Sequence, residues 1–235
     1  MNTWLPLTSF VISAIFALSV FHRYRRRHGN HLLLWGIGMV FYAIGSFCEA
    51  YYGALGWNPL IFRLWYLFGA ILVAAWLGQG TVYLLAKKKW AHVTMGLLLL
   101  GTIYGVVRVF TATLDPSLMT GSEMSGHAIV TPGVRVLTPF FNMYGTVTLV
   151  GGAAYSAWLF WRKRVLLHRT LGNILIAAGA LAPAFGGAFS RFGISGALYI
   201  GELLGAVLMF IGFLRATTPM EEKYKRRTKQ AVSTD

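Results

Sequence analysis

Long apolar runs alternate with short polar stretches along the whole chain. A helix needs about 20 mostly apolar residues to cross a bilayer. Seven runs come close to that length or exceed it: residues 4–21, 32–52, 61–85, 93–112, 137–161, 171–190 and 195–214. The pattern predicts an all-α membrane protein with seven transmembrane helices.

The polar stretches differ in charge. All but four of the 21 lysines and arginines fall in residues 22–31, 87–89 and 162–169 or after residue 214. Basic loops stay on the cytoplasmic side of a membrane, so we expect the N-terminus outside and the C-terminus inside. This divides the chain into a membrane domain (1–218, with an outer loop at 113–136) and a basic cytoplasmic tail (219–235).

Composition supports this interpretation, because 12% of the residues are charged and 56% are hydrophobic, whereas soluble domains carry about 25% charged residues. The basic residues that give the net charge of +14 lie between apolar segments rather than on the surface of a soluble domain. We therefore expect contacts with anionic lipid headgroups at the cytoplasmic face and no nucleic-acid partner. The first apolar segment lacks a basic leader, and we expect an uncleaved protein of a prokaryotic inner membrane.

Parts of the chain look repeated. Residues 14–35 and 153–175 share the order apolar, aromatic, basic, histidine, apolar, and residues 66–78 are similar to 199–212. One interpretation is a parallel repeat of three helices on either side of a linker helix, which resembles the plan of sugar-transporter and PQ-loop proteins. The other is that membrane segments with basic flanks look alike. The matching helices contain no PQ dipeptide, so no family is assigned.

One carboxylate interrupts the last apolar run. Glu202 lies between Gly201 and Gly205, and a carboxylate at membrane depth costs about 2.5–3.5 kcal/mol unless it is paired, protonated or hydrated. The glycines allow another helix to approach closely. We therefore expect Glu202 at a helix interface or in a cavity.

Other ionisable residues are predicted to lie in the same outer half of the bundle, and tyrosines share helix faces with two of them. A polar, net positive pocket in this layer would bind a small anionic or zwitterionic ligand. The alternative is that the carboxylates pair with arginines to hold helices together, while other arginines extend to headgroups. The candidate ligand-binding residues are Glu202, Glu49, Arg63, Arg108, Tyr66, Tyr199 and Arg191.

Signals for cofactors and catalysis are weak. Cys48 is the single cysteine, the histidines lie near segment ends or in a loop rather than at mid-membrane, and the last segment has no lysine for a retinal Schiff base. No motif for nucleophilic or metal-assisted catalysis occurs. We expect no cofactor and no metal, and no enzymatic activity. Tryptophans near segment ends, including Trp65, are typical of interfacial aromatic belts.

Two classes of function follow. The first is binding, with or without translocation, of the ligand through an outward-facing pocket. The second is a receptor-like sensor or an accessory subunit that docks a partner on its basic cytoplasmic face. Either class allows a protein partner or a homo-oligomer. Pro183 inside the sixth segment, followed by Gly186 and Gly187, predicts a kinked helix that fits either a moving part or a static bundle.

Overall fold

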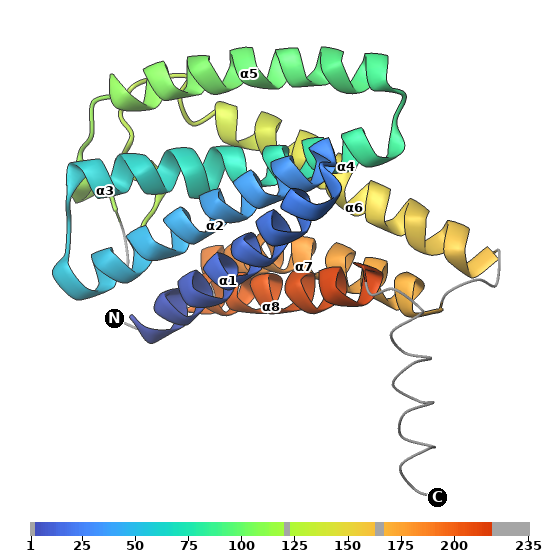
Figure 1. Cartoon of the computed structure of the whole chain (residues 1–235). Helices are drawn as coiled ribbons and strands as arrows, with labels where there is room; N and C mark the ends of the chain where they lie inside the picture. The colour runs from blue at the N-terminus through green and yellow to red at the C-terminus, as the bar shows by residue number, and fades with distance from the viewer. Residues whose placement is uncertain (1–2, 120–122, 163–166, 218–235) are drawn as a thin grey trace, which may run out of the picture.

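The computed structural model describes residues 3–119, 123–162 and 167–217, and its elements are helical (Figure 1). Three short helices follow one another without a break, from α3 through the π-helix η1 to α4, so the described part contains seven long helices. The all-α prediction is confirmed, and each predicted segment coincides with one long helix. The elements are α1 (Trp4–Arg27), α2 (Asn30–Leu55), α3 (Pro59–Leu64), η1 (Trp65–Leu72), α4 (Val73–Leu85), α5 (Lys88–Phe110), the 3₁₀ turns η2 (Pro116–Leu118) and η3 (Gly126–Ala128), α6 (Leu137–Arg162), α7 (Leu167–Arg191) and α8 (Ala197–Thr217).

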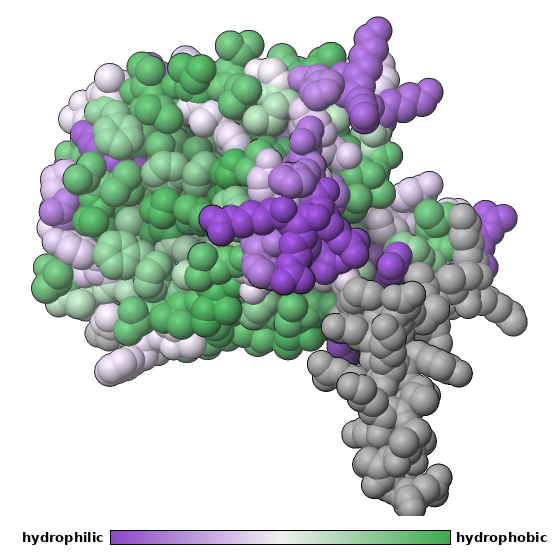
Figure 2. All heavy atoms as spheres, in the orientation of Figure 1, coloured by the Kyte–Doolittle hydropathy of each residue, from purple (hydrophilic) through white to green (hydrophobic). Residues whose placement is uncertain are grey.

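Six of the long helices in the described residues are long and apolar enough to cross a membrane. The exception is α6, which carries Asn142 and several threonines and tyrosines along its length. Apolar side chains cover most of the side of the bundle visible in Figure 2, and hydrophilic ones gather at one end. These features are compatible with an integral membrane protein. The orientation in a membrane and the internal repeat stay predictions.

The helices form two groups that meet only in part. Helix α4 packs against α2 and α6, and α5 covers α4 and η1 from outside (Figure 1). Helices α7 and α8 pair closely with each other, and they contact the remaining helices mainly through α1 and α6. Room is therefore left between the α7–α8 pair and the wall formed by α2 and η1.

Glycines bring α7 and α8 together. A Cβ atom added to Gly201 would lie 2.6 Å from the carbonyl oxygen of Ala182, and one added to Gly205 would lie 2.9 Å from that of Gly179. Gly172 and Gly212 meet in the same way. The close approach predicted beside Glu202 is confirmed, and it makes α7 and α8 a tightly joined pair.

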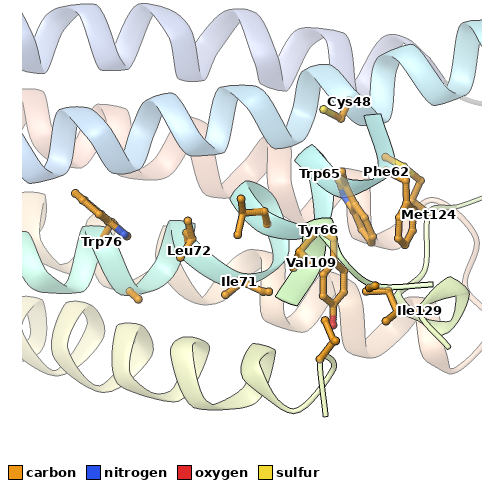
Figure 3. Close-up of a cluster of buried hydrophobic side chains, with 14 of the residues drawn as sticks. Cys48, Phe62, Trp65, Tyr66, Ile71, Leu72, Trp76, Val109, Met124 and Ile129 are labelled. Atoms are coloured by element: carbon orange, nitrogen blue, oxygen red, sulfur yellow. The ribbon is translucent and has the colours of Figure 1, made fainter. Parts of the chain in front are cut away.

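Two buried clusters stabilise the bundle. Figure 3 shows the first, in which Phe62, Trp65 and Tyr66 pack with Met124 and Ile129 of the long loop after α5. This loop is therefore folded onto the α3–η1 segment. The second cluster joins five helices near mid-bundle, through Phe16, Met39, Leu77, Leu149, Met209 and Phe213.

Candidate functional site

A cavity of about 460 Å³ lies between the two groups of helices. Its lining residues come from α2, η1, α4, α6, α7 and α8, and most of them lie in the half of each long helix nearer the loop that follows α5. At mid-bundle the cavity ends on Leu77, Leu149 and Met209, which belong to the second apolar cluster. The polar side chains of the lining are Tyr42, Ser46, Glu49, Trp65, Thr138, Asn142, Thr146 and Glu202.

Glu49 belongs to the wall formed by α2 and η1. Its side chain is buried, and its Oε1 atom accepts a hydrogen bond of 2.8 Å from the indole nitrogen of Trp65. Its Oε2 atom is buried without a hydrogen-bond partner. Glu49 is thus held in place on the side of Trp65.

Glu202 lies on α8, across the cavity. The hydroxyl of Tyr42 donates a hydrogen bond of 2.6 Å to the backbone carbonyl of Glu202, which joins α2 to α8. The Oε2 atom of Glu202 is also buried and without a partner. The two carboxyl groups lie near enough to interact with each other, and neither forms an ion pair with another described residue.

The segment η1 shapes the wall beside Glu49. A Cβ atom added to Gly45 of α2 would lie 2.9 Å from the Cα of Gly69, so the two backbones touch at the cavity edge. Asn142 of α6 donates a hydrogen bond of 3.0 Å to the carbonyl oxygen of Ala70. Single turns of π-helix inside α-helices are frequent at functional sites, and here the π segment supplies part of the lining.

The predicted arginines lie elsewhere. Arg63 donates hydrogen bonds to the backbone carbonyls of Val109 and Ala112, at the end of α5, the latter at 2.9 Å. Arg108 donates one of 2.6 Å to the carbonyl of Pro132 in the loop. Neither lines the cavity. The guanidinium–carboxylate pairs of the alternative interpretation do not occur among the described residues.

Among the described side chains, the other candidates do not line the cavity. Tyr66 and Tyr199 are buried, and neither is among the lining residues; Tyr66 accepts a hydrogen bond of 2.9 Å from the hydroxyl of Thr138. The side chain of Arg191 lies outside the described part. Of the seven candidates, the structure brings Glu49 and Glu202 together in the cavity.

Sequence reasoning missed the role of Trp65. Its position near a segment end favoured an aromatic belt, yet the side chain is buried and donates to Glu49. The two residues lie on different helices, so no spacing in a single sequence indicates the pair.

A third carboxylate lies at the loop end of the bundle. Glu123 accepts a hydrogen bond of 2.7 Å from the backbone nitrogen of Gly196 and another from the hydroxyl of Ser190. It ties the long loop to the turn between α7 and α8. Glu123 also lies near enough to interact electrostatically with Glu49 and Glu202, which makes this end of the cavity acidic.

Groups of three or more histidine, cysteine, aspartate or glutamate side chains placed to hold a metal ion are absent from the described residues. Comparison with known protein families, with curated proteins and with solved structures gave no match. The fold and the site define a class: an all-helical chain, compatible with an integral membrane protein, that encloses a cavity with two carboxyl groups.

Proposed function

We propose that this protein binds a small organic cation in the cavity, with Glu49 and Glu202 as its charge partners. The observation that carries the proposal is the pair of carboxyl groups on the cavity lining, close enough to hydrogen-bond to each other and without a cationic side chain beside them among the described lining residues. Two ionised carboxylates side by side in a low-dielectric interior are costly without a cation. A protonated amine placed between them would satisfy both acceptors.

The size and the apolar lining support the same class of ligand. A cavity of about 460 Å³ falls within the usual range of about 300–1,000 Å³ for small-molecule sites. Small apolar residues such as Ala180, Ala184 and Gly187 line the α7 side, where an alkyl or ring portion would fit. A zwitterion would bind through its ammonium end. An anion finds no arginine among the described lining residues.

Translocation is the second part of the proposal. The cavity occupies one half of the bundle, and the apolar cluster at Leu77, Leu149 and Met209 closes it toward the other half. With the predicted orientation in a prokaryotic inner membrane, this arrangement corresponds to an outward-facing state. Movement of the α7–α8 pair, which carries Pro183 in its cavity wall, would give access from the inside.

The second class of function would use the same cavity. A receptor-like sensor or an accessory subunit would bind the cation without moving it and would signal through a protein partner at the basic end. Uptake of a labelled cation into proteoliposomes separates the two, because only a transporter accumulates it.

Thermal unfolding of the purified protein tests the binding proposal. We expect butylammonium and tetramethylammonium to raise the melting temperature, and butyrate of the same ionic strength to leave it unchanged. The increase should disappear in Glu49→Gln/Glu202→Gln and persist in Asp115→Asn, which removes a carboxylate outside the cavity. A larger effect of butyrate, or an amine effect that survives in the double variant, would contradict the proposal.

The orientation is tested by labelling in intact cells. In a Cys48→Ala background, a cysteine at exposed Val130 should react with a membrane-impermeant maleimide, and one at Lys88 should not. The reverse result would turn the cavity toward the cytoplasm.

A further inference from the structure

A second hollow lies at the opposite end of the bundle from the acidic cavity. It is a groove of about 630 Å³ between the ends of α1 and α8. Its basic lining consists of His22, Arg23, Arg26 and Arg27. None of these residues takes part in the proposed binding of a cation, so the groove needs an explanation of its own.

Among the residues that the structure describes, no carboxylate pairs with the cationic part of the groove. Arg23 donates a hydrogen bond of 2.7 Å to the backbone carbonyl of Thr217, which fixes it between the two helices. Arg27 and Arg169 lie near enough to repel it. Arg26 and Arg27 are exposed and form no ion pair with a described residue. An anion placed here would relieve the repulsion and meet several guanidinium groups at once.

Apart from Ser19 and Thr217, the remaining lining is apolar and lies on one side of these charges. Ile15 and Leu18 precede the arginines on α1 by one turn or more, and Phe213 and Leu214 face them from α8. Ile15 and Leu18 are exposed on the side of the bundle, which is the surface that the bilayer would cover. The groove therefore runs from an apolar strip at membrane depth to a cluster of positive charge at the helix ends.

We propose that the groove binds one anionic phospholipid, with its phosphate on Arg23, Arg26 and Arg27 and an acyl chain along Ile15 and Leu18. Soluble phosphate would match the charges and make no use of the apolar strip at Ile15 and Leu18. A neutral phospholipid would match the strip and leave the net positive charge uncompensated. The proposal is independent of the acidic cavity and of what that cavity binds.

The test compares lipids on the full chain in phosphatidylcholine nanodiscs. We expect added phosphatidylglycerol to raise the melting temperature by several degrees, and inorganic phosphate or additional phosphatidylcholine to have no such effect. The increase should fall by at least half in Arg26→Gln/Arg27→Gln, whose side chains are exposed and form no hydrogen bonds with described residues. It should persist in the matched control Lys87→Gln/Lys88→Gln, which removes two charges at the same end but outside the groove.

A second variant tests the acyl contact without changing charge. Leu18→Trp should fill the apolar strip and lower the fraction of protein that retains a phosphatidylglycerol molecule in native mass spectrometry, by about as much as the double arginine variant does. The proposal is overturned if phosphate stabilises as well as the lipid does, if both double variants respond alike, or if Leu18→Trp retains lipid as wild type does.

Discussion

The two walls of the acidic cavity each carry a glutamate, but they hold it differently. On the α2–η1 wall, Glu49 is buried and accepts a hydrogen bond from Trp65, and Gly45 brings α2 against the π segment. On the α7–α8 wall, the Glu202 carboxyl group lies within hydrogen-bond reach of the Glu49 carboxyl group, and no indole donor like that of Trp65 holds it among the described residues. Its backbone is held to α2 by Tyr42.

This difference assigns different parts to the two walls. The first is fixed by aromatic packing and by polar contacts between helices, so Glu49 presents an acceptor in a constant position. The second is a glycine-packed pair that contacts the other helices mainly through α1 and α6. Under the proposed function, this pair is the part of the bundle that moves, and Glu202 adjusts to the ligand. In the proposed function, Glu49 therefore positions the cation and Glu202 completes the site.

Separating the α7–α8 pair should have the largest effect. Gly201→Leu places a Cβ atom 2.6 Å from the Ala182 carbonyl oxygen and 2.9 Å from the Gly186 Cα, so the backbones must part. We expect a loss of about 3 kcal/mol or more in the free energy of unfolding. Gly96→Leu is the control, because nothing lies within 4 Å of a Cβ atom there. Equal melting temperatures for the two variants would show that the pair is not joined through glycine.

Removing the donor to Glu49 should come next. Trp65→Phe keeps the aromatic packing and leaves the Oε1 atom of Glu49 without its partner, at a cost of about 1–3 kcal/mol. Trp76→Phe is a matched control, because it removes an indole hydrogen bond of 3.3 Å to the hydroxyl of Thr102. Chemical denaturation in detergent should show the larger loss for Trp65→Phe. If Trp76→Phe lowers the free energy of unfolding by as much, the hydrogen bond to Glu49 contributes no more to stability than the one to Thr102.

The π segment should respond to a smaller change. Asn142→Leu removes the hydrogen bond to the Ala70 carbonyl, and we expect a loss of about 0.5–1.5 kcal/mol with faster hydrogen exchange confined to residues 65–72. Asn173→Leu removes an amide that donates within its own helix. It should leave exchange in that segment unchanged. Unaltered hydrogen exchange in Asn142→Leu would show that the contact with α6 does not stabilise the π segment.

The smallest effect is expected at Arg108. Its contact is with the loop carbonyl of Pro132, so Arg108→Gln should leave the amine-induced increase in melting temperature as it is in wild type. Loss of that increase would show that Arg108 contributes to ligand binding, as the sequence analysis predicts.

Much of the fold is predictable because it depends on apolar length. Each long helix follows from an uninterrupted apolar run, and the spacing of Gly201 and Gly205 predicts the close approach at α8. The π segment could not be predicted, since the run at 61–85 has no gap that would mark it. The membrane depth predicted from the sequence likewise assigns arginines and glutamates to one layer, but it does not indicate where each side chain points.

The site shows the same limit. The insertion cost of a carboxylate identifies Glu202, and depth adds Glu49. Free carbonyls at the end of α5 accept the hydrogen bonds of Arg63, an outcome that depends on how helices pack. The sign of the charge on the cavity lining therefore follows from tertiary structure and not from the number of charged residues in the layer.

The central claim, that the cavity is acidic, can be tested without knowing the ligand. In a Cys48→Ala background, Thr146→Cys places a thiol on the cavity lining with little change in volume. The account predicts that a trimethylammonium-bearing methanethiosulfonate reacts with this thiol at least about tenfold faster than a sulfonate-bearing one, after division by their rates with free 2-mercaptoethanol. Glu49→Gln/Glu202→Gln should bring the ratio close to one. A ratio below one in the parent protein, or one that the double variant leaves unchanged, would contradict the account.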